Sequence, residues 1–121
     1  MLKYVLMLTV LLPLAGHAQV TPERLDRLTA EAQTQVVEWR RWFHQNPELS
    51  NREVNTAAYI AEALKEMGIE AKTGIAGYGI VAVIEGGKPG PLVALRTDMD
   101  GLPVTEQTGL PFASTARSEY N

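Results

Sequence analysis

The 121-residue sequence contains no cysteine, so neither a disulfide framework nor a thiolate metal site can form within it. Histidine is scarce too, because only His17 and His44 are present. A zinc site of three or four protein ligands cannot be completed from so few imidazoles without thiolates, so we predict no metal site made by this chain alone. There is no excess of basic residues, with 11 Lys and Arg against 14 Asp and Glu, which argues against a nucleic-acid partner.

Residues 1–18 have the pattern of a secretory signal peptide. Lys3 gives a short positive start, residues 5–15 form an apolar run, and small side chains precede a cleavage site at Gln19. The run is shorter than the roughly 20 apolar residues that span a membrane, and Pro13 interrupts it. We therefore predict an exported protein, periplasmic or secreted, whose mature chain has no membrane attachment.

Two helices are predicted in the first half of the mature chain. The first runs from an N-cap at Thr21 to about Asn46, the residue before a proline, and apolar residues recur along it at helical spacing. The second begins at a capping box formed by Ser50 and Glu53, and Gly68 provides its C-terminal stop.

Three strands are predicted after the second helix. Residues 69–73 alternate in polarity, and residues 79–85 contain a continuous β-branched run typical of a strand buried on both faces. The Gly-rich link to a third strand at 92–97 is too short for a crossover, so these two strands should pair antiparallel. Helices followed by strands indicate an α/β protein, with strands that belong to a mixed central sheet needing further neighbours.

The third predicted strand ends in two carboxylates one residue apart, Asp98 and Asp100. Reactive groups in α/β sheets gather beyond the carboxyl ends of strands, so both are candidates for acid–base or metal-assisted chemistry. Turns also favour Asp, and in a purely structural interpretation Asp98 caps a turn while Asp100 faces water. A further alternative is the Asp-x-Asp motif of haloacid-dehalogenase-type phosphatases, which holds magnesium and attacks a phosphoryl group, but Leu102 stands where that family carries Thr.

Two other features have structural interpretations. His44, the only histidine of the mature chain, lies at a predicted helix end, where it can interact with the helix dipole or cap the helix. The glycines at 74, 77 and 79 do not form a dinucleotide-binding fingerprint, because a β-branched run rather than a helix follows them.

Five short motifs occur in order along the mature chain. They are Arg40-Arg41-x-x-His44-x-x-Pro47-Glu48-Leu49-Ser50; Gly74-Ile75 with Gly79-Ile80-Val81-Ala82-Val83; Gly86-Gly87-Lys88-Pro89-Gly90-Pro91; Ala94-Leu95-Arg96-Thr97-Asp98-Met99-Asp100-Gly101-Leu102-Pro103; and Glu106-x-Thr108-Gly109-Leu110-Pro111-Phe112. Together they resemble the N-terminal part of the M20 peptidase family, in its amidohydrolase branch of N-acyl-amino-acid and hippurate hydrolases. The resemblance extends from about Leu25 to Asn121.

The resemblance implies a zinc-exopeptidase-like α/β domain, of which residues 19–121 would be the incomplete N-terminal part. It also implies two divalent metal ions, zinc or manganese, and a metal-activated water that attacks an amide carbonyl. The substrates would be N-acyl amino acids or similar small amides, and the full-length form would be a homodimer. The amidohydrolase branch carries a Cys-Gly-His-Asp segment a little further on, and every expected metal ligand would lie beyond the sequence given, so the chain alone should be inactive.

The resemblance also assigns individual residues. Other branches of the family end this strand in His-x-Asp, where the His binds metal and the Asp orients it; here Arg96 takes the place of the His. Asp98 is therefore the expected catalytic position, and a non-catalytic truncated relative is the alternative. The expected supporting residues of the site are Arg96, Asp100, Glu48 and His44.

Overall fold

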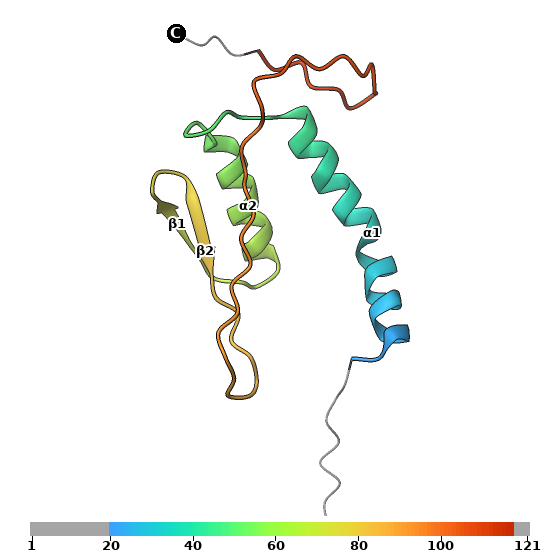
Figure 1. Ribbon diagram of the computed structural model, residues 1–121, viewed down its shortest axis with the longest axis vertical. Coiled ribbons are helices and arrows are strands. Elements are labelled where there is room, and N and C mark those ends of the chain that lie inside the picture. The colour runs from blue at the N-terminus through green and yellow to red at the C-terminus, as the bar shows by residue number, and fades with distance from the viewer. Residues whose placement is uncertain (1–19, 118–121) are drawn as a thin grey trace, which may run out of the picture. The chain divides into compact units, whose positions relative to one another are not determined.

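A computed structural model describes residues 20–117 (Figure 1). The predicted signal peptide and its cleavage site lie outside these residues. The elements are α1 (Pro22–Gln45), α2 (Val54–Glu66), β1 (Ala71–Ile75) and β2 (Gly79–Ala82), which confirms the α/β class. The chain divides into two units at residues 33 and 34, and every residue of the candidate site belongs to the second unit. None of the helices described is long and apolar enough to cross a membrane.

Helix α1 begins and ends as its sequence predicts. The Thr21 hydroxyl accepts a hydrogen bond from the Arg24 N–H at 3.3 Å, which satisfies one of the free donors of the first turn. At the other end, both the backbone N–H and the side-chain amide of Asn46 donate to the Trp42 carbonyl, at 3.0 and 2.9 Å. Pro47 cannot donate a further helical bond, so the helix stops there.

The capping box predicted for α2 is wrong. Helix α2 starts at Val54, and Glu53 occupies the N-cap position without a side-chain hydrogen bond to the helix. Ser50 lies in a turn closed by a 2.9 Å bond from the Arg52 N–H to the Leu49 carbonyl. This turn separates Ser50 from the free N–H groups of the helix start, and another residue, described below, satisfies them.

Helix α2 ends in a Schellman motif, as Gly68 predicts. The Gly68 N–H donates to the Lys65 carbonyl, and the Ile69 N–H donates to the Leu64 carbonyl, both at 2.9 Å. Gly68 has a φ of 72°, a left-handed conformation that costs glycine little. The chain then reverses into the hairpin beside α2 (Figure 1).

Strands β1 and β2 form an antiparallel hairpin. Ala71 is paired with Ala82 and Ile75 with Gly79, and the register shifts between them. Gly74, with a φ of 76°, lies at this bulge, a position that glycine often occupies. A strand follows the glycines, as predicted, which agrees with the rejection of a dinucleotide-binding loop.

The strand predicted at residues 92–97 is not formed. The described sheet contains only β1 and β2, and the Leu92, Val93 and Leu95 side chains are 84–98% exposed. The β-branched run at 79–85 is likewise not buried, because β2 ends at Ala82 and the apolar residues beyond it lie in solvent. No described element covers these side chains, so the apolar burial that would offset the entropy of ordering a strand is missing.

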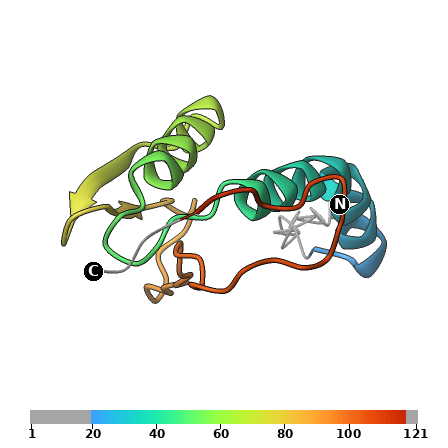
Figure 2. The ribbon, with the colours of Figure 1, turned by 90° about the horizontal axis from the view of Figure 1, so that it is seen from above.

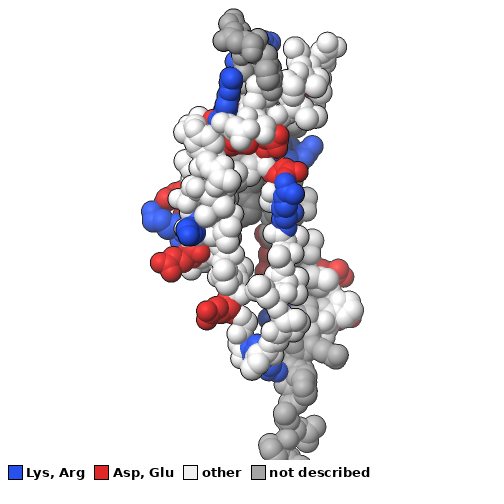
Figure 3. Space-filling view, turned by 60° about the vertical axis from the view of Figure 1, so that its left-hand side comes forward, with Lys and Arg blue, Asp and Glu red and all other residues white. Residues whose placement is uncertain are grey.

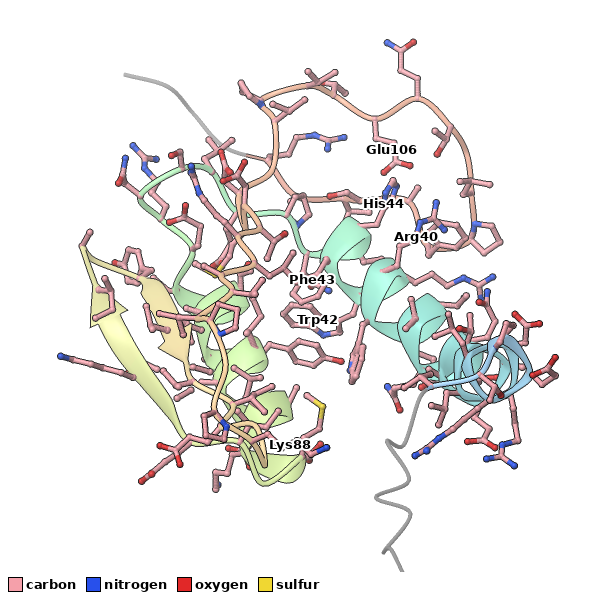
Figure 4. All side chains as sticks on the ribbon, turned by 60° about the horizontal axis from the view of Figure 1, so that its bottom comes forward. Arg40, Trp42, Phe43, His44, Lys88 and Glu106 are labelled. Atoms are coloured by element: carbon pink, nitrogen blue, oxygen red, sulfur yellow. The ribbon has the colours of Figure 1, made fainter. Side chains whose placement is uncertain are left out.

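Aromatic side chains pack between the end of α1 and α2. The Trp42 ring stacks on Tyr59 with a centroid distance of 3.9 Å, and Phe43 meets the same ring edge-on at 5.6 Å. Trp42 and Phe43 project from α1 toward α2 (Figure 4). Among the described residues only Thr56 is fully buried, at 2% exposure, so this cluster holds the two helices together rather than forming a closed core.

Candidate functional site

Asp98 lies on an extended segment and is open to solvent. Its Oδ1 accepts a hydrogen bond from Arg96 Nη2 at 3.0 Å, and the two side chains are 73% and 90% exposed. The structure thus brings two of the predicted site residues together. An ion pair this exposed is well screened by water, so it fixes the Asp98 carboxylate only weakly.

Asp100 is also exposed, but the residue after it is fixed in place. The Gly101 N–H donates a 2.7 Å hydrogen bond to the Glu48 carbonyl. A Cβ atom at Gly101 would lie 2.7 Å from the Pro47 Cβ, closer than two such carbons can approach. The chain that carries Asp98 and Asp100 is therefore anchored to the loop between α1 and α2 at a point that only glycine fits.

The Glu48 side chain caps helix α2. Its Oε1 accepts from the backbone N–H and the side-chain amide of Asn55, at 3.1 and 2.8 Å, and its Oε2 accepts from the Thr56 N–H at 2.7 Å. The Asn55 and Thr56 N–H groups are donors that an N-cap side chain normally satisfies, and a carboxylate here also complements the helix dipole. Partial burial acts to raise the pKa of Glu48, but the hydrogen bonds from Thr56 and Asn55 outweigh it and hold the pKa below the usual value.

His44 contacts a residue that the sequence analysis did not single out. Its Nε2 lies 2.7 Å from Glu106 Oε1, and Figure 4 shows the two side chains pointing toward each other. Glu106 also accepts hydrogen bonds from the Thr108 hydroxyl and from the Ser114 N–H, the latter at 2.5 Å. The Thr108 hydroxyl, then His44 and the Ser114 N–H, lower the pKa of Glu106 to about 2. Glu106 is thus an anion whose side chain is only 12% exposed.

Phe112 extends this contact along α1. Its ring meets the His44 imidazole nearly edge-on at 5.5 Å, and the Arg41 guanidinium lies 5.0 Å from its centroid. The segment 104–114 therefore lies against the last turns of α1, as Figures 1 and 2 both show. The only signal for this contact in the sequence is the motif that begins at Glu106, whose residues are too far from α1 along the chain for local patterns to pair them.

The described residues do not gather a metal site. Among residues 20–117 no three His, Cys, Asp or Glu side chains lie close enough to hold an ion together. His44 is engaged by Glu106, and Asp98 by Arg96. Acidic and basic side chains are interspersed on the face drawn in Figure 3. These residues alone therefore do not fit a two-metal centre, and we derive no step through one.

Comparison with known proteins identifies the relatives of this chain. It is 48% identical over 80 residues to the N-acetyl-L-cysteine deacetylase of Bacillus subtilis, covering 66% of the chain and 19% of that protein. It is 39% identical over 95 residues to the N-acyl-L-amino acid amidohydrolase of Geobacillus stearothermophilus, covering 78% and 26%. A solved Bacillus subtilis structure, a dinuclear metal-binding peptidase of the M20 family, matches 72% of the chain and 25% of its own with 41% identity and a TM-score of 0.67. The chain is homologous to part of the M20 amidohydrolases.

The M20 relationship confirms the resemblance carried by the five motifs. No family model matches the chain, so the relationship rests on individual relatives and on the shared fold. The chain spans about a fifth to a quarter of the length of these M20 relatives. They give no support to the phosphatase interpretation of Asp98 and Asp100.

Proposed function

We propose that this chain is part of an exported, metal-dependent amidohydrolase that cleaves the amide bond of N-acyl amino acids or similar small amides. The observation that carries the proposal is the similarity to the N-acyl-L-amino acid amidohydrolase over 95 residues. This match covers 78% of the chain. The amidohydrolase of this proposal is a longer protein, because the matched region makes up only 19% and 26% of the deacetylase and amidohydrolase relatives.

The metal centre of this proposal holds two divalent ions, zinc or manganese. The dinuclear metal-binding peptidase among the relatives supports two ions, although the residues described here do not supply a set of ligands. When bound, such ions activate water and polarise an amide carbonyl. Asp98 is the proposed catalytic carboxylate of this chain, with Arg96, Asp100, Glu48 and His44 in support. The proposed longer protein acts in the periplasm or outside the cell and forms a homodimer.

The proposal is tested by assaying the longer protein on hippurate and on N-acetyl amino acids. Hydrolysis should disappear after treatment with a chelator and return with zinc or manganese. A metal-replete, folded protein that hydrolyses none of these amides would contradict the proposal and favour the non-catalytic relative. Sequencing the reading frame past Asn121 is a cheaper first step, because a Cys-Gly-His-Asp segment there would supply the expected ligands.

Export is tested separately. A reporter fused to residues 1–121 and expressed in a Gram-negative host should appear in the periplasm with an N-terminus at Gln19. A product that retains Met1 would exclude a cleaved signal peptide.

A further inference from the structure

The loop Pro47–Glu48 contacts both helices and the Asp98 segment. It follows the end of α1, its carboxylate caps α2, and its Glu48 carbonyl accepts the Gly101 N–H at 2.7 Å. We propose that this contact, the Gly101 clamp, is a positioning device. It holds the segment that carries Asp98 against the loop that leads into α2. The inference deepens the amidohydrolase proposal and rests on it.

The first argument is steric. An added Cβ at Gly101 would lie 2.7 Å from the Pro47 Cβ, and the Glu48 carbonyl oxygen and the Pro47 Cα would each lie 3.5 Å away. Gly101 does not have a positive φ, so its backbone conformation alone does not require glycine. Close approach to Pro47 is the remaining reason for glycine here, and any larger residue must push the segment away from the loop.

The second argument is that the other side of the clamp is itself rigid. Three hydrogen bonds of 2.7 to 3.1 Å hold the Glu48 carboxylate on the first turn of α2. Thr56, in that turn, is the one fully buried residue among those described. The loop therefore cannot follow a displaced Gly101 without losing the cap of α2.

The third argument is that, among residues 20–117, the Asp98 side chain has no hydrogen bond or ion pair to a helix. Its side-chain partner, Arg96, comes from the same exposed segment. The clamp, three residues from Asp98, bonds this segment to the loop whose Glu48 side chain caps α2. Since displacements of about 1 Å can lower a rate about 100-fold, a tie at this position can decide activity.

The test compares Gly101→Ala with the matched control Gly90→Ala in the longer protein. Gly90 has nothing within 4 Å of an added Cβ and no positive φ. Gly101→Ala should lower kcat at least about 10-fold with little change in KM, and the backbone amide of residue 101, which bonds the Glu48 carbonyl, should exchange hydrogen faster. Gly90→Ala should leave both measurements unchanged.

A double variant separates positioning from general damage. Pro47→Gly removes the atom with which the added Cβ of Gly101→Ala would collide. The double variant Pro47→Gly, Gly101→Ala should therefore recover much of the activity and exchange protection relative to Gly101→Ala alone. Unchanged exchange in Gly101→Ala would show that the clamp does not hold the segment. Faster exchange with normal kcat, or no recovery in the double variant, would overturn the positioning role. An inactive wild type with a protected Gly101 amide would instead refute the amidohydrolase proposal while confirming the contact.

Discussion

Glu106 and Asp98 both stand in motifs shared with M20 enzymes, but their surroundings differ greatly. Glu106 is held by His44, Thr108 and Ser114 and is 12% exposed, whereas Asp98 has Arg96 alone and is 73% exposed. Asp98, the proposed catalytic carboxylate, thus has fewer hydrogen-bond partners than Glu106. Glu106 joins the end of α1 to residues 108 and 114, whereas the Asp98 side chain bonds only Arg96 among the described residues.

The largest expected effect is complete loss of activity in the isolated mature chain. If the surroundings of Asp98 come from elsewhere, residues 19–121 produced alone should not hydrolyse hippurate above background. They should also melt over a broad range and associate, because their apolar segments and strand edges are exposed. Calorimetry, size-exclusion chromatography and a metal-supplemented assay measure this. A monomer with a sharp transition, or with metal-dependent activity, would show that residues 19–121 are sufficient for folding or for catalysis.

The next effect is that of Asp98→Asn in the longer protein. The substitution keeps the shape of the side chain but removes its charge, and carboxylates that tune a metal site typically contribute about 10–100-fold. We expect kcat to fall at least about 10-fold with little change in KM. Asp100→Asn is the matched control, with a smaller effect on kcat and a larger one on melting temperature. Normal kcat in a folded, metal-loaded Asp98→Asn protein would return this residue to a structural role.

Local sequence signals predicted the features that are completed within a few residues. Thr21 and Pro47 bound α1, and Gly68 ends α2 through bonds that reach back only three to five residues. The glycines of the hairpin turn likewise identify a turn between two strands. In each case the interaction that forms the feature joins residues close together in the sequence, so a local pattern is enough to predict it.

Features that depend on distant partners were missed or wrong. The cap of α2 comes from Glu48, outside the Ser50–Glu53 pattern. The strand at 92–97 needs neighbours and cover that the described residues lack. The contact of His44 with Glu106 joins residues 62 positions apart. The resemblance located Asp98, but no single-sequence pattern pairs side chains over such distances.

The third prediction concerns acid stability, because Glu106 has the most strongly lowered pKa among the described residues. Its pKa falls from 4.5 to about 2 in the folded protein, so its ionised form stabilises the fold above pH 4.5, and this contribution is lost as the pH falls toward 2. Glu106→Gln should lower the melting temperature at pH 7 and flatten the pH dependence between 4.5 and 2. Glu62→Gln, at a mostly exposed ion pair, is the control. A parallel pH dependence in wild type and Glu106→Gln would contradict the assignment.

A smaller effect is expected from removing the cap of α2. Glu48→Ala should destabilise the longer protein by about 1 kcal/mol, the usual value of an N-cap side chain. Glu53→Ala is a close control, because Glu53 occupies the N-cap position without a capping bond and should change stability by less than about 0.5 kcal/mol. Chemical denaturation measures both. A larger loss of stability in Glu53→Ala than in Glu48→Ala would instead support the predicted capping box of Ser50 and Glu53.

The smallest effect on stability is expected at the Asp98 ion pair. Arg96→Gln breaks a contact between two side chains that are mostly exposed, and such surface pairs contribute about 0–1 kcal/mol, so the melting temperature should hardly move. If Arg96 supports the site in the longer protein, kcat should nevertheless fall, with partial rescue in Arg96→Lys because that variant keeps the charge. Arg117→Gln, whose residue donates a hydrogen bond to the neighbouring Ala116 carbonyl, controls for loss of a surface cation. A lower melting temperature with unchanged kcat would mean that Asp98 and Arg96 have a structural role. Asp98 and Glu106 would then differ only in how deeply their side chains are buried.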